Sequence, residues 1–133
     1  MPLSPEETVS NYKEKMHNWE LKCKERIDAC KRGERDFENT ISTLMSEYME
    51  IFREYCSSTA IPRSFCFSQP PEYESSDKII EVIDEREICK IIVECKYHPN
   101  QKSEFRLVCE DGKWRILERN IVTNRGTVLS ADL

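Results

Sequence analysis

The sequence predicts an α+β domain in which an N-terminal helix pair packs on a strongly curved antiparallel sheet. Apolar residues recur at helical spacing through the first part of the chain, and from Lys78 onward they recur at every second residue. Turn signals separate the alternating runs. Because the helices come first and the strands follow in succession, the two kinds of element are segregated. We expect one domain over 1–133, with a helical part over 1–57 and a sheet over 77–123.

The first helix has a clear start and a clear end. Ser4 is a favoured N-cap, Pro5 suits the first helical position, and Glu7 completes a capping box. An apolar stripe continues from there for about seven turns, and Gly33 predicts the helix end. A second stripe predicts a helix over 37–55. The two stripes fit either one bent rod or a helical hairpin, and Gly33 favours the break.

Four alternating runs predict the strands of the sheet, at 79–84, 87–97, 103–110 and 113–122. Asp111 and Gly112 form a tight hairpin signal between the last two runs. Leu117 and Ile121 interrupt the alternation of the last run, which predicts a β-bulge. Residues 127–133 carry little signal. Alternation places the following side chains on the helix-facing side of the sheet: Cys89, Ile91, Val93, Cys95, Tyr97, Phe105, Leu107, Cys109, Trp114 and Ile116.

Negative charge is concentrated in one stretch of the chain. The 133 residues include 20 basic and 25 acidic side chains, which gives a net charge of −5. Residues 72–94 contain 8 acidic and 3 basic side chains, so this stretch alone has a balance of 3 − 8 = −5. An acidic chain lacks the basic footprint of a nucleic-acid-binding protein. The stretch is therefore either a solvated rim or a surface that attracts a basic partner.

The sequence also excludes other classes of protein and of site. No apolar run approaches the roughly 20 residues that cross a bilayer, and the N-terminus lacks the basic start and apolar region of a signal peptide. We therefore expect a cytoplasmic protein with no membrane partner and no nucleic-acid partner. The seven cysteines lack zinc-site spacing and fit small buried apolar side chains better. We expect no disulfide, no metal and no cofactor.

The order of elements and the last hairpin resemble a known superfamily. The hairpin carries an acidic-Gly-x-Trp-x-Ile motif at 111–116, and with the helix pair before it the chain resembles the NTF2-like superfamily. The sequence PPEY at 70–73, which leads into the first strand, makes the chain most similar to the NTF2-fold immunity proteins of bacterial polymorphic toxin systems. One departure is that no short helix can be placed between the strands, as other NTF2-like branches have.

The resemblance implies a cytoplasmic protein that binds and neutralises a cognate toxin domain and is not an enzyme. Many such toxins are basic nucleases, so an acidic surface would suit a basic toxin. The candidate partner-binding residues in the acidic stretch are Glu72, Tyr73, Glu74, Asp77, Glu81, Asp84, Glu85 and Glu87. A homodimer is a second possible partner, because apolar residues lie on the side of the strands opposite the helices: Ile80, Val82, Ile88 and Ile92.

The alternative is a small-molecule enzyme or ligand-binding protein of the SnoaL/ketosteroid-isomerase-like kind, with a pocket between the helices and the sheet. The pocket-lining candidates are Tyr12, Trp19, Tyr48, Tyr55, Tyr97 and Trp114. An enzyme of this kind needs an acidic base that points into the pocket. Asp84 and Glu118 are the only strand-borne acids whose facing is ambiguous. No catalytic set of residues is evident from the sequence.

Overall fold

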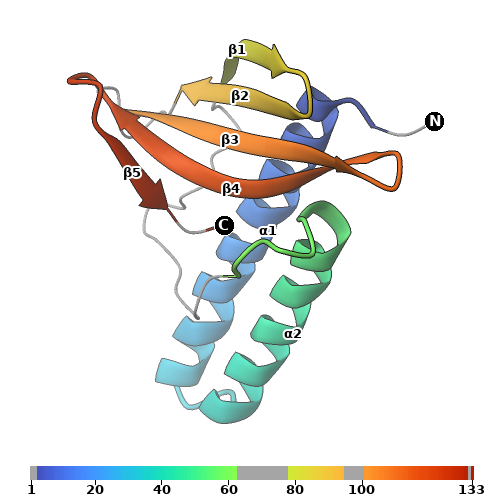
Figure 1. Ribbon diagram of the computed structural model, residues 1–133. Coiled ribbons are helices and arrows are strands. Elements are labelled where there is room, and N and C mark those ends of the chain that lie inside the picture. The colour runs from blue at the N-terminus through green and yellow to red at the C-terminus, as the bar shows by residue number, and fades with distance from the viewer. Residues whose placement is uncertain (1–2, 63–77, 95–100, 132) are drawn as a thin grey trace.

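The computed structural model describes residues 3–62, 78–94, 101–131 and 133. Two helices lie side by side against one face of a five-stranded sheet (Figure 1). This arrangement confirms the predicted α+β class, with the helices segregated to one face of the sheet. Neither helix among the described residues has the length and apolar character needed to cross a membrane.

Helix α1 (Pro5–Lys31) begins at the predicted capping box. The backbone N–H of Glu7 donates to Ser4 Oγ at 3.1 Å, and the backbone N–H of Ser4 donates to Glu7 Oε1 at 3.1 Å. Soon after the helix ends, Gly33 takes a φ of +76°, a left-handed value that glycine adopts without strain. The chain reverses at this point, so the two helices form a hairpin and not one bent rod (Figure 1).

Helix α2 (Phe37–Tyr55) has the bounds that the apolar stripe predicts. Its N-cap is Asp36, whose side chain accepts a hydrogen bond from the backbone N–H of Asn39 at 3.0 Å. An ion pair of 3.0 Å between Arg26 Nη1 and Glu47 Oε1 joins the two helices. Ion pairs near the surface contribute little individually, so the apolar stripes of the two helices supply most of the attraction between them.

The sheet consists of β1 (Lys78–Glu85), β2 (Ile88–Glu94), β3 (Gln101–Glu110), β4 (Lys113–Thr123) and β5 (Val128–Ala131). The strands lie side by side in chain order, and each is antiparallel to its neighbours. The first four strands confirm the predicted runs; the predicted continuation at 95–97 lies outside the described residues. The structure adds β5, whose four residues have no alternation that would predict a strand.

The β3–β4 hairpin has both irregularities that the sequence predicts. Asp111 and Gly112 form its turn with φ values of +52° and +78°, as a tight two-residue hairpin requires. Leu117 has no partner in β3, although the residues on either side of it pair with neighbouring positions of that strand. This bulge shifts the alternation of β4. As a result, Ile116 and Arg119 are both buried on the helix-facing side.

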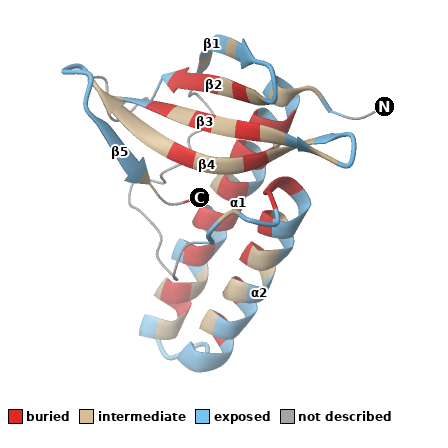
Figure 2. Cartoon of the chain, viewed as in Figure 1, coloured by how far each residue is buried: buried red, intermediate tan, exposed pale blue. Residues whose placement is uncertain are grey.

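The core lies between the helix pair and the middle of the sheet (Figure 2). Helix α1 packs against β2 and β4, and α2 packs against β4. Six of the side chains that were expected to face the helices are buried, which confirms the prediction for them: Cys89, Ile91, Val93, Phe105, Leu107 and Ile116. By contrast, β1 and β5 at the two edges of the sheet are largely exposed (Figure 2).

Two residues near the β3–β4 turn correct the prediction. Cys109 is exposed, although alternation placed it inward, and its cross-strand partner Trp114 is only half-buried. The cause is the position of the hairpin end, which projects beyond the helices (Figures 1 and 2). Trp114 therefore packs against the edge of the core and does not close it.

Candidate functional site

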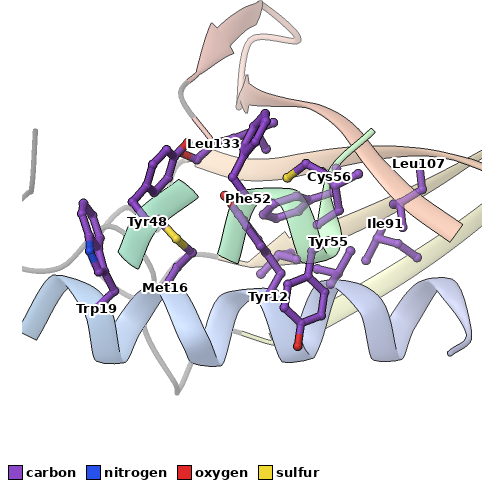
Figure 3. Packing of buried hydrophobic residues seen from close by; sticks show 14 of the residues in the cluster. Tyr12, Met16, Trp19, Tyr48, Phe52, Tyr55, Cys56, Ile91, Leu107 and Leu133 are labelled. Carbon is purple, nitrogen blue, oxygen red and sulfur yellow. The ribbon is translucent and has the colours of Figure 1, made fainter. Parts of the chain in front are cut away.

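Three of the aromatic pocket candidates fill the core. Tyr12, Trp19 and Tyr48 are almost completely buried in the hydrophobic core (Figure 3). The indole N–H of Trp19 donates to the carbonyl oxygen of Leu44 at 2.9 Å, and the hydroxyl of Tyr48 donates to the carbonyl oxygen of Leu133 at 3.1 Å. The three aromatic rings fill the space in which a pocket was expected. Because the side chains of a protein core are close-packed, no room for a ligand is left between these rings.

The remaining described candidates, Tyr55 and Trp114, line a depression at the rim of the fold. It has a volume of about 240 Å³, and Leu3, Thr8, Glu54, Lys113 and Arg115 complete its lining. Burial raises the pKa of the Tyr55 hydroxyl, which therefore remains protonated at neutral pH. The last candidate, Tyr97, lies outside the described residues.

The two acids of ambiguous facing do not enter this depression. Asp84 pairs with Cys89 across β1 and β2 and so lies on the helix-facing side, but it is exposed at the edge of the sheet. Glu118 lies on the opposite side of the sheet, where Arg106 Nη1 donates to its Oε1 at 2.7 Å. General acid–base catalysis needs a carboxyl group within hydrogen-bond reach of the substrate. Neither carboxyl group provides this at the depression.

Glu110 joins the end of α2 to the β3–β4 hairpin. The hydroxyl of Ser57 donates to Glu110 Oε2 at 2.6 Å, and the backbone N–H of Ser58 donates to Oε1 at 3.3 Å. These hydrogen bonds, the Ser57 hydroxyl first among them, lower the pKa of the Glu110 carboxyl. Arg115 donates to the carbonyl oxygens of Arg53 and Glu54 at 3.1 Å each. The polar groups of this junction therefore hold two elements together.

The acidic candidates on β1 have a different environment. We call Glu81, Asp84, Glu85 and Glu87 the β1 acidic surface; all four are exposed. Glu81 and Glu85 lie on the side of the sheet opposite the helices, Asp84 lies on the helix-facing side, and Glu87 lies in the β1–β2 turn. The carboxylates therefore surround the edge of the sheet and do not form a patch on one face. The other partner-binding candidates, Glu72, Tyr73, Glu74 and Asp77, lie outside the described residues.

Most of the β1 acidic surface is not neutralised by neighbouring side chains. Glu85 pairs with Lys90 at 3.4 Å. Glu81, Asp84 and Glu87 form no ion pair and no hydrogen bond with any side chain that the structure describes. Charged groups that are exposed and unpaired keep their full attraction for an approaching partner of opposite sign.

The tertiary structure adds one feature to this surface that sequence reasoning missed. Burial, and then the nearby carboxylates of Asp84 and Glu6, raise the pKa of the Cys89 thiol, so the start of α1 brings another negative charge close to β1. The acidic first helical turn is visible in the sequence, but no local pattern indicated that it would meet β1.

The apolar positions expected on the side of the sheet opposite the helices are only partly confirmed. Ile80 and Val82 are 44% and 42% exposed. Val82, however, pairs with Ile91 and so lies on the helix-facing side, because an irregularity near Ile80 shifts the alternation of β1. Ile92 is buried.

The cysteines and metal-binding side chains that the structure describes give no further candidate site. The five cysteines in the described part of the chain are free thiols: Cys23, Cys30, Cys56, Cys89 and Cys109. The described residues contain no group of three or more cysteine, histidine or acidic side chains that could hold a metal ion. Burial raises the pKa of the Cys56 thiol to about 12, so this thiol is not reactive at neutral pH.

Comparison with known proteins gives one match. A family model described as an NTF2 fold immunity protein matches residues 4–126. The matched range starts at the N-cap of α1 and ends in the β4–β5 turn, so it includes both helices, the first four strands and the β1 acidic surface. The comparisons with curated proteins and with solved structures found no match.

Proposed function

Because the chain belongs to the NTF2 fold immunity protein family, we propose that it binds a cognate toxin domain and neutralises it. The description of the family supports an immunity role in general, and the match agrees with the resemblance noted in the sequence. We propose that the protein acts in the cytoplasm. Its role is not catalytic, because binding alone prevents the toxin from acting.

The β1 acidic surface is the observation that carries the proposal for where the toxin binds. Three of its four carboxylates are exposed and have no described partner, and the apolar side chains of Ile80 and Val82 lie beside them. Such a surface combines apolar area, which supplies binding energy, with charge, which selects the partner. We include Glu72, Tyr73, Glu74 and Asp77 in the proposed surface because they precede β1 directly in the chain.

The charge of this surface favours a basic toxin. Exposed carboxylates attract a cationic protein over distances of about a Debye length, roughly 8–10 Å at physiological salt. This attraction raises the association rate more than it raises the final affinity. It also allows the carboxylates to cover a cationic active site, such as one that binds phosphate groups.

Self-association would need a different surface. Strand β1 contains three acidic residues and one basic residue, so two copies of it would repel through their net negative charge. Strand β5 forms the opposite edge and contains no charged residue; its Val128 and Leu129 are 56% and 51% exposed. We therefore assign any homodimer to β5 and keep β1 for the toxin. Sedimentation of the purified chain, with and without Leu129→Lys, would measure this directly.

The test of the proposed function is protection of cells in which the toxin domain encoded beside this chain is expressed. The wild-type chain is expected to restore growth and to bind the purified toxin domain. A chain that binds nothing and gives no protection would refute the proposal.

A matched pair of variants then tests where the toxin binds. The β1 charge variant carries Glu81→Lys, Asp84→Lys and Glu87→Lys, and it leaves the Glu85–Lys90 ion pair intact. The helix charge variant carries Glu14→Lys, Glu25→Lys and Glu50→Lys, three exposed acids of α1 and α2. Both variants change the net charge by the same amount, so only the position of the charge differs. Protection should be lost for the first variant and retained for the second.

A further inference from the structure

We propose that β1 binds an extended basic segment of its partner as an additional strand of the sheet. The inference rests on the proposed function, because it specifies how the toxin domain would engage the β1 acidic surface. It predicts main-chain hydrogen bonds along β1, with apolar and basic side chains of the partner on either side of them. Three observations on the strand support it: an edge that no described strand pairs with, the pattern of its side chains, and its net negative charge.

The first observation is the position of β1 in the sheet. It pairs with β2 alone among the described strands, so no described strand pairs with its second edge. An open edge presents backbone N–H and C=O groups that another strand can pair with. The eight residues of β1 make this edge as long as many complete strands. The pairing with β2 is continuous from Glu81 to Glu85, after an irregularity near Ile80.

The second observation is the pattern of side chains on this edge. Val82 and Asp84 lie on the helix-facing side, where they pair with Ile91 and Cys89, and Glu81 lies on the other side. An added strand would place its own side chains directly opposite these residues. An apolar residue opposite Val82 and a lysine or arginine opposite Glu81 or Asp84 would give favourable pairs on both sides of the sheet. Because Glu81 and Asp84 lie on opposite sides of the sheet with Val82 and Ile83 between them, the edge fits a segment in which two apolar residues lie between two basic ones.

The third observation concerns the other possible occupant, a second copy of this chain. Each β1 strand carries one basic residue, Lys78, and three carboxylates, a balance of 1 − 3 = −2. Two copies of the strand therefore repel each other as they approach. Charges on an edge strand also protect a protein from aggregation with itself. The acids of β1 thus disfavour a second copy and favour a basic partner by the same electrostatic effect.

Amide hydrogen exchange on the full chain tests the inference with two probes. The first probe is the toxin domain encoded beside the chain. The second is a synthetic peptide as long as β1 with the central sequence lysine–valine–valine–lysine, and its control carries glutamate in place of each lysine. Strand addition predicts that exchange of β1 amides slows by about tenfold or more in the complex, because hydrogen-bonded amides exchange only when the structure opens. Exchange in β5 should not change.

The outcomes separate this inference from the proposed function. If the toxin domain binds and protects cells but β1 amides exchange as in the free chain, strand addition is wrong and the immunity function stands. If the lysine peptide slows β1 exchange but the toxin domain does not bind, the edge site stands and the proposed function fails. If neither probe binds, both are wrong. In the supporting case, the β1 charge variant should associate with the toxin at least about tenfold more slowly, and the helix charge variant should match wild type.

Discussion

The β1–β2 and β3–β4 hairpins use their acidic residues in opposite ways. Both hairpins close with two-residue turns that contain positive φ values, at Arg86 in the first and at Asp111 and Gly112 in the second. In the β3–β4 hairpin, Glu110 accepts hydrogen bonds from the end of α2, and Glu118 pairs with Arg106. In the β1–β2 hairpin, three of the four acids of the β1 acidic surface have no described partner.

The difference follows from where each hairpin lies on the helix pair. The β3–β4 hairpin meets the C-terminal end of α2, where Cys56 and Ile116 form a parallel bridge and the backbone N–H of Ser57 donates to the carbonyl oxygen of Ile116 at 2.8 Å. Strand β1 lies at the edge of the sheet, away from α2 (Figure 1). Acids that contact a second element stabilise the fold, and acids that contact none remain available to a partner.

The largest expected difference between the hairpins is in their contribution to stability. Leu107→Ala in β3 should lower the free energy of unfolding by about 2–5 kcal/mol, because Leu107 is completely buried. Val82→Ala in β1 should lower it by less than about 1 kcal/mol, because Val82 is exposed although it lies on the same side of the sheet. Urea denaturation measures both. Equal losses would mean that β1 is part of the core.

The next effect concerns Cys56, which joins α2 to the β3–β4 hairpin. Burial raises the pKa of its thiol from about 9 to about 12 in the folded chain. As the pH rises, the Cys56 thiol therefore ionises in the unfolded chain before it ionises in the folded chain. The stability that the neutral, buried thiol provides below about pH 9 is lost as the pH rises toward 12. Between pH 8 and pH 10.5, wild type should lose about 2 kcal/mol more than Cys56→Ala. The matched control is Cys109→Ala, which removes an exposed thiol from the same hairpin.

A smaller effect is expected at the projecting end of the β3–β4 hairpin. Trp114→Ala should lower the free energy of unfolding by about 1–2 kcal/mol, which is less than the 3–5 kcal/mol typical of a buried tryptophan. The reason is that Trp114 is half-buried and lines the rim depression. Trp19, which is buried, provides the comparison in the same urea titrations. A loss as large as that of Trp19→Ala would contradict the position of the hairpin end.

The smallest effect is expected at the Ser57–Glu110 hydrogen bond. Ser57→Ala should lower the free energy of unfolding by about 1 kcal/mol at neutral pH. Because the pKa of Glu110 is lowered, the stability from its carboxylate is present above about pH 4.5 and is lost as the pH falls through the folded-state pKa. Ser57→Ala should therefore be less sensitive to acid than wild type. Glu81→Gln serves as the control from the first hairpin and should leave stability at neutral pH unchanged.

Much of the fold was predictable from local patterns. The capping box at Ser4 and the glycine at Gly33 predicted the bounds of α1, and alternation predicted β1–β4 and the bulge at Leu117. These signals act between residues close in the chain, so they can be read without the tertiary structure. Strand β5 lacked such a signal. It forms because β4 presents an edge to it, with pairs such as Ile121 and Leu129.

The candidate site was only partly predictable for the same reason. The sequence by itself determined that negative charge concentrates around β1 and that the helices and strands have apolar faces. Only the tertiary structure decided that Glu110 is held by Ser57, which is 53 residues away, while Glu81 and Asp84 lie on an edge strand and have no partner among the described side chains. It also placed Tyr12, Trp19 and Tyr48 in the core. Whether a charge is neutralised or a ring is buried depends on distant segments that come together, and no local pattern records those contacts.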